Sequence, residues 1–208
     1  MELKVCVSTI ESYKNNTPGL WLTLPQDSNY LKKQLSNTFP GAVPSDYLTQ
    51  NFTGDLLFTY SDNIFDINHL AQYLNDLPHN DVMSIIGYCK GMDVRSCNKI
   101  FNVSLQVQKI KSFTLSTDKC SDLEAQLGKA IVETHAELKS SIQKASKLLS
   151  ADYFDYKALG AKTDADLGGY FYPGKYIDCY NSNIYLNAYS KDDIKTRLAS
   201  SPKKRVSR

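Results

Sequence analysis

The sequence predicts an α+β protein in which short antiparallel strands and amphipathic helices follow one another in separate zones. Near the N-terminus, Leu3, Val5 and Val7 alternate with polar or small residues, which is the two-residue period of a strand. After residue 121, apolar residues instead recur at steps of three, four or seven, as in an amphipathic helix. The 208 residues are 42% hydrophobic, which is enough to bury a core.

The first zone, residues 1–64, is predicted to be a small sheet with one helix. Asn, Thr, Pro and Gly fill residues 15–19 and indicate a turn between two strands, so the first two strands should form a hairpin. Asp27 or Ser28 is expected to cap the helix. The strands are predicted at residues 3–9, 20–24 and 55–60.

Residues 65–105 form a second, helical zone. We expect one helix capped by Asp66 and ended by Pro78, and another capped by Asn80 or Asp81 and ended by Gly91.

The third zone, residues 106–189, is predicted to contain helices and strands. Ser121 and Glu124 form a capping-box pattern that opens a helix of about 25 residues. A short helix over residues 150–160 ends at Gly160, and three short strands follow at residues 170–172, 175–178 and 184–186. Residues 190–208 lack an apolar stripe, and we expect them to be a disordered basic tail.

The net charge of +2 conceals a strong asymmetry along the chain. Residues 34–89 contain six Asp and no Lys or Arg, a net charge of −6. Residues 90–119 carry +4, and residues 190–208 carry +5. Segregated charge of this kind indicates partners that are recognised electrostatically.

The residue inventory offers little for catalysis, so we expect no enzyme, no cofactor and no metal site. The five cysteines form no Cys-x-x-Cys pair, and no phosphate-binding or hydrolase motif is present. No signal peptide and no membrane-spanning stretch is predicted. The odd number of scattered cysteines suits a reducing compartment, and a cytoplasmic location follows as an expectation.

One short segment is unusual. Three aromatic residues, Tyr153, Phe154 and Tyr156, lie among two carboxylates, Asp152 and Asp155. On a helix the two carboxylates would be neighbours, which is mildly destabilising unless the pair serves a purpose. The alternative is that Asp152 only stabilises the positive end of the helix.

The sequence resembles the ArdA family of antirestriction proteins over about residues 3–189. The N-terminal Gly19-Leu20-Trp21-Leu22-Thr23-Leu24-Pro25, the helix over residues 67–78 and, most specifically, the segment Tyr153–Gly160 carry the resemblance. It implies an elongated homodimer whose subunits have three small mixed α/β domains with antiparallel sheets. It also implies a mimic of duplex DNA, encoded by a mobile genetic element, that occupies the DNA-binding groove of type I restriction–modification enzymes or of a related defence protein.

In such a mimic, surface carboxylates take the place of phosphates and bind the lysines and arginines of the target. The candidate target-binding residues are Asp46, Asp55, Asp62, Asp66, Asp76, Asp81, Asp152, Asp155, Asp164 and Asp166.

Two alternatives stay open. The chain could bind nucleic acid itself, on an ArdA-like scaffold, through residues 90–119 and the basic tail, with weak contact through the tail alone as a lesser form. Alternatively, it could be an assembly protein of a mobile element, because its 14 tyrosines suit a protein interface.

Overall fold

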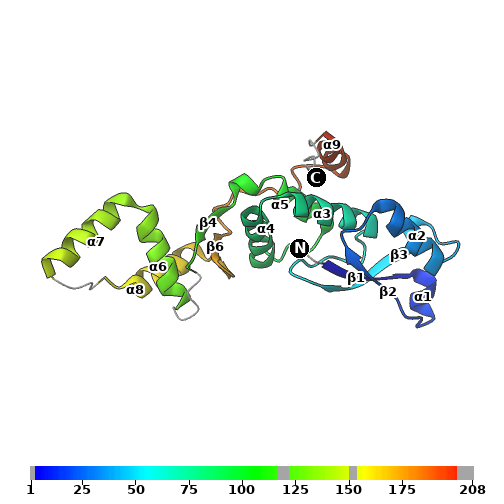
Figure 1. Ribbon diagram of the computed structural model, residues 1–208, viewed down its shortest axis with the longest axis horizontal. Coiled ribbons are helices and arrows are strands. Elements are labelled where there is room, and N and C mark those ends of the chain that lie inside the picture. The colour runs from blue at the N-terminus through cyan, green and yellow to red at the C-terminus, as the bar shows by residue number, and fades with distance from the viewer. Residues whose placement is uncertain (1–2, 117–121, 150–153, 201–208) are drawn as a thin grey trace, which may run out of the picture. The chain divides into compact units, whose positions relative to one another are not determined.

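The computed structural model describes residues 3–116, 122–149 and 154–200, with the side chains of residues 198–200 left out. It contains helices and antiparallel sheets, so the predicted α+β class is confirmed. The described residues divide into two compact units: those of Met1–Val107 with Tyr185–Arg208, and those of Gln108–Ile184. Figure 1 labels the elements of both units. The division into three domains stays a prediction.

The sheet of the first unit consists of β1 (Leu3–Thr9), β2 (Leu20–Leu24) and β3 (Tyr47–Thr53), in the order β2-β1-β3. The predicted hairpin is confirmed, because β1 and β2 are antiparallel neighbours with Leu3 opposite Leu24. A short helix, α1 (Ile10–Lys14), lies in their connection.

Five further α-helices lie within the described residues of the first unit. Asp27 caps α2 (Ser28–Thr38) as predicted, and its carboxylate accepts hydrogen bonds from the N–H groups of Asn29 and Tyr30. The others are α3 (Ile64–Asp76), α4 (His79–Gly91) and α5 (Cys97–Ser104), followed near the C-terminus by α9 (Lys191–Ser200). Two 3-10 turns, η1 (Pro44–Asp46) and η2 (Val107–Lys109), complete the helical elements up to residue 109.

Several sequence predictions in this unit are wrong. Residues 55–60 are not a strand: Leu56 and Phe58 are buried alternately, but Asp62 Oδ2 accepts hydrogen bonds from the Thr59 N–H and hydroxyl and turns the chain. Asn63, not Asp66, caps α3, and α4 begins directly after Pro78.

The predicted disordered tail is also wrong over Lys191–Ser200, which form α9. The Ser190 hydroxyl accepts a hydrogen bond from the Asp193 N–H, and the Asp193 carboxylate accepts one from the Ser190 N–H, a capping box that begins the helix. Ile194 is only 4% exposed, which gives the helix one apolar anchor. The rest of the predicted tail, residues 201–208, lies outside the described residues.

The second unit has a three-stranded antiparallel sheet in the order β4-β6-β5. Its strands are β4 (Lys111–Thr114), β5 (Tyr170–Tyr172) and β6 (Lys175–Asp178), and its helices are α6 (Leu123–Thr134), α7 (Ala136–Leu149) and α8 (Tyr156–Leu167). The core of the unit contains Leu115, Leu127, Ile131 and Tyr176. The strand predicted at residues 184–186 is absent, because Gln106 takes the backbone bonds of Tyr185.

The long helix predicted after residue 121 is instead two helices that meet at His135. The side chains of Thr134 and His135 both bond the Ile131 carbonyl, at 2.9 and 2.8 Å. Side chains that compete for a backbone carbonyl interrupt the helical hydrogen bonds, so α6 ends and α7 begins one residue later.

Within the described residues, every helix is too short or too polar to cross a membrane.

Candidate functional site

The segment that carries the family resemblance forms the start of α8. The Asp155 carboxylate caps this helix, accepting a hydrogen bond from the Ala158 N–H at 2.8 Å. The predicted helix over residues 150–160 therefore starts later and continues past Gly160, to Leu167, where Gly168 has a φ of +57° and ends it. Asp152 and Tyr153 lie outside the described residues.

Gly160 lies where α8 crosses α6. A Cβ atom on Gly160 would lie 1.8 Å from the Glu124 carbonyl oxygen, and one on Gly128 would lie 1.9 Å from the Tyr156 carbonyl oxygen. Both contacts are far below van der Waals distance and involve rigid backbone. The two glycines therefore let the helix backbones touch, and the glycine of the segment has a structural purpose.

Lys157 holds a small charged cluster at this crossing. Its ammonium group donates a hydrogen bond to Asp122 Oδ2 at 2.9 Å and lies 3.9 Å from Glu124 Oε2. The hydrogen bond to Asp122 raises the pKa of Lys157, and the charges of Asp122, Glu124 and Asp155 raise it further. The same bond lowers the pKa of Asp122.

The cluster has an excess of negative charge. The carboxylates of Asp122 and Glu124 lie within 2.9 and 3.9 Å of the one ammonium group, and the nearby charge of Asp155 adds to them by raising the pKa of Lys157. Asp122 caps α6 and Asp155 caps α8, so two of the carboxylates lie at helix N-termini, which stabilise anions. Cap hydrogen bonds hold the Oδ1 atoms of Asp122 and Asp155 in place, so these two carboxylates have fixed positions.

Two aromatic residues of the family-like segment, Phe154 and Tyr156, pack beside this cluster. The Phe154 and Tyr156 rings meet edge to face with centroids 5.0 Å apart, and Lys129 Nζ lies 5.9 Å from the centroid of the Tyr156 ring. Both rings are half-buried, which indicates packing against the helices.

Asp164 and Asp166 occupy different environments on α8. The buried Tyr176 hydroxyl donates a hydrogen bond to Asp164 Oδ1 at 2.8 Å and accepts one from the Gly169 N–H at 2.9 Å. Burial is the main reason why the pKa of Tyr176 is raised well above its usual value. Asp166 is exposed and pairs with Lys162, one turn away, at 2.9 Å.

Four of the acidic residues predicted in the first unit have intramolecular partners. Asp46 accepts a hydrogen bond from the Val43 N–H, Asp55 pairs with Lys90, and Asp66 pairs with Lys191. The fourth, Asp62, bonds the backbone of Thr59 and Cys97, which gives it a structural role. Asp76 is exposed and Asp81 is half-buried.

Sequence reasoning missed Asp122, Glu124 and Lys157 as members of one cluster. The capping pattern at residue 121 was a signal for the first two, but it predicts only a helix start. Their proximity to Lys157 depends on the crossing of α6 and α8, which no local pattern encodes.

Comparison with known proteins finds no matching family model and no matching curated protein.

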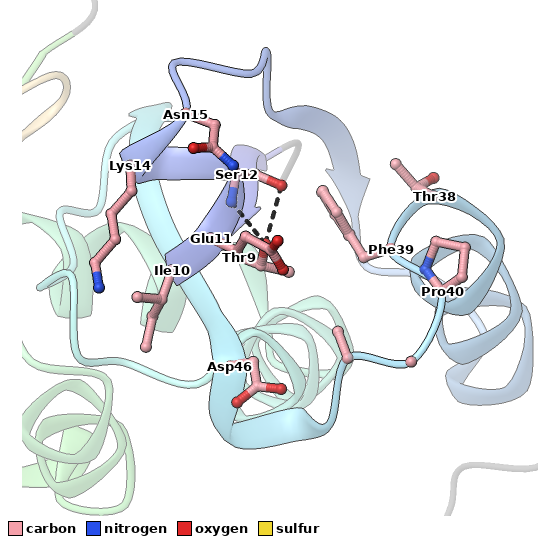
Figure 2. A pocket seen from close by; sticks show the side chains of 12 residues that line it. Thr9, Ile10, Glu11, Ser12, Lys14, Asn15, Thr38, Phe39, Pro40 and Asp46 are labelled. Carbon is pink, nitrogen blue, oxygen red and sulfur yellow. Dashed lines mark hydrogen bonds between the residues drawn. The ribbon is translucent and has the colours of Figure 1, made fainter.

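The first unit also contains a polar cavity of about 740 Å³, shown in Figure 2. It lies between α1 and residues 38–46, and Glu11, Lys14 and Asp46 are among its lining residues. Carboxylates and an ammonium group line this cavity together, so its charge does not favour one class of ligand. We assign no function to the cavity. Elsewhere in the described part of the chain, no three His, Cys, Asp or Glu side chains gather as a metal site.

Replacing Tyr176 with phenylalanine is expected to lower the free energy of unfolding of the second unit by about 1–3 kcal/mol, because the variant leaves Asp164 and the Gly169 N–H without their buried partner. Equilibrium denaturation in urea measures the loss. Tyr180→Phe is the control, because Tyr180 is 71% exposed and its hydroxyl group can bond water in either state. Equal stability of both variants would contradict a structural role for this hydrogen-bond pair.

Proposed function

We propose that this protein is an antirestriction protein that imitates duplex DNA and occupies the DNA-binding groove of a type I restriction–modification enzyme or a related defence protein. The observation that carries the proposal is the carboxylate cluster of Asp122, Glu124 and Asp155 at the crossing of α6 and α8. The segment that most resembles the ArdA family contributes Asp155 to this cluster, together with Lys157, which binds the other two carboxylates. Action as a homodimer, in the cytoplasm and without a cofactor, is part of the proposal.

The physical argument rests on charge held in fixed positions. Duplex DNA carries one phosphate charge per about 1.7 Å of its axis, and its protein partners bind it through grooves lined by Lys and Arg. Carboxylates fixed by cap hydrogen bonds lose little freedom when they bind those side chains, which favours association. Asp166 lies exposed on α8, where its pair with Lys162 is largely screened by water, so a partner's cation can replace that lysine.

Two of the candidate carboxylates do not contribute to this proposal. Asp62 and Asp164 are engaged by backbone groups and a buried hydroxyl, so replacing either would disturb the fold before it altered recognition. Asp155 and Asp166 are exposed and suit a test of function.

Nucleic-acid binding by the chain itself has weaker support. Lys90, Arg95 and Lys191 each form an ion pair with a carboxylate of this chain, which reduces the positive charge that they offer to a phosphate. A DNA-binding protein usually keeps such residues on an open basic surface.

The double variant Asp155→Asn with Asp166→Asn is expected to inhibit the target about five- to tenfold less than the parent chain, because two charges facing a basic groove are lost. Asn still caps a helix, so α8 keeps its N-terminus. Displacement of a fluorescent duplex from a type I methyltransferase core, measured by anisotropy, gives the inhibition constant.

Asp27→Asn is the matched control, because Asp27 is also an exposed helix cap but lies on α2, outside the candidate surfaces. Inhibition should be unchanged in this variant. If the double variant folds and inhibits as strongly as the parent, the cluster is not the recognition site. If the parent binds the duplex directly and displaces nothing, the protein is a nucleic-acid-binding protein instead.

A further inference from the structure

Two buried amide side chains, Asn102 on α5 and Gln106 just after it, anchor the chain where it returns to the first unit. Asn102 donates a hydrogen bond to the Tyr189 carbonyl and accepts one from the Tyr189 N–H, at 3.1 and 2.7 Å. One turn later, Gln106 makes the same two bonds to the backbone of Tyr185, at 2.9 and 3.3 Å. Because both amides are buried, residues 185–189 are fixed firmly against α5.

Beyond these anchors, the described contacts of α9 are mostly exposed ones, such as the Arg197 guanidinium, which lies 4.2 Å from the centroid of the Tyr189 ring. Lys191 Nζ lies 2.6 Å from Asp66 Oδ2, but the two side chains are 61% and 28% exposed, so water screens the pair. Among the side chains described in this helix, only Ile194 is buried. In Figure 1, α9 lies beside α5 as a single helix at the edge of the unit.

Under α9 lies a small cavity of about 50 Å³ with a mixed polar and apolar lining. Its polar walls include the carboxylates of Asp62 and Asp66, and Lys191 and Lys195 of α9, while Phe101 and Ile194 are among its apolar walls. Asn98 also lines it, and the Asn98 Oδ1 atom is buried without a hydrogen-bond partner within the described residues. A gap of this size with polar groups in its wall has room for water, so α9 does not fill its seat completely.

We propose that α9 is a displaceable cover, and that a lysine- or arginine-rich segment of a partner protein replaces it on the seat around Asp66. The ion pair between Lys191 and Asp66 shows the chemistry that the seat accepts, a flexible cation beside an acidic helix face. This inference rests on the proposed function, since a basic target groove would supply such a segment. The helix therefore acts as an internal competitor that a partner must displace.

The variant Ile194→Ser tests whether α9 is a displaceable cover, and it leaves the charge of the chain unchanged. It removes the buried apolar side chain that the structure describes in α9, so the cover should open more often and fluorescein-labelled decalysine should bind about tenfold more tightly than to the parent chain. Adding Asp66→Asn should abolish this gain in affinity, because a neutral amide then replaces the uncovered carboxylate. Unchanged decalysine affinity in Ile194→Ser, or a gain that survives Asp66→Asn, overturns the proposal.

The thiol of Cys97 gives a second readout that needs no partner. It is buried beneath α9, so its alkylation by N-ethylmaleimide reports how often the cover opens. Peptide mass spectrometry should show about fivefold faster labelling of Cys97 in Lys191→Ala, whereas Lys144→Ala on α7 should leave the rate unchanged.

Faster labelling of Cys89 or Cys179 as well would indicate general unfolding and count against a local cover. No restriction enzyme takes part in either measurement. The cover can therefore be established even if inhibition of a restriction enzyme fails, and the two proposals are separable.

Discussion

Replacing Gly160 with alanine is expected to destabilise the second unit by about 3 kcal/mol or more. The added methyl group would lie 1.8 Å from the Glu124 carbonyl oxygen, so α6 and α8 must move apart. The sign of this stability change is informative, because replacing Gly with Ala inside an isolated helix stabilises the helix by about 1 kcal/mol. Equilibrium unfolding in urea and hydrogen exchange of peptides from α6 and α8 measure the effect.

The matched control for this variant is Ala165→Gly, an exposed position later in α8. It should cost only about 1 kcal/mol, the ordinary propensity difference. Peptides from β1–β3 should keep their exchange rates in both variants, because they belong to the other compact unit. A stabilised Gly160→Ala protein would mean that the helix backbones do not touch.

This packing role affects how the family-like segment is interpreted. A Gly160 variant that lost inhibition would say nothing about recognition, because its fold would be disturbed first. Asp155 lies in the same segment but contributes charge at an exposed cap. Substitutions of exposed charges such as Asp155 therefore test recognition by the segment, whereas substitutions of Gly160 test only its packing.

Local patterns predicted the elements whose signals are complete within a few residues. The hairpin of β1 and β2 follows from alternation around a Pro-Gly turn, and α2 follows from its Asp27 cap. In contrast, β3 was missed because Tyr47–Thr53 is mostly polar, and its pairing with β1 comes from tertiary contact. Helix α9 was missed because its first turns are mostly charged, and among their described side chains only Ile194 is buried.

The candidate site shows the same limit in its charges. Sequence reveals where the carboxylates are but not what neutralises them. Asp164 bonds Tyr176, twelve residues later, and Asp66 pairs with Lys191 at the far end of the chain. The cluster around Lys157 depends on two glycines, Gly128 and Gly160, which allow the helices to cross closely. Such partnerships depend on tertiary structure, so counting charges along the chain overstates the acidic surface.

Replacing Asn102 with alanine is expected to release the returning chain from α5 and to lower its local stability by about 2–4 kcal/mol. The variant removes both hydrogen bonds to the backbone of Tyr189 and leaves that partly buried N–H and carbonyl without these partners. It also removes the bond from the Asn102 amide to the Asn98 carbonyl. Hydrogen exchange of peptides covering residues 185–200 measures the loss.

Asn98→Ala is the matched control for this prediction, because Asn98 lies one turn earlier on α5 and its Oδ1 atom bonds nothing in the described structure. Removing that side chain should cost less than about 1 kcal/mol. Comparison with Ile194→Ser then distinguishes the anchor from the cover. Ile194→Ser should speed exchange in α9 alone, whereas Asn102→Ala should speed it in α9 and in residues 185–189 together. If Asn102→Ala loosens neither segment, the paired amide bonds do not hold the chain to α5, and α9 must be positioned by its own side chains, such as Lys191 bound to Asp66 and the buried Ile194.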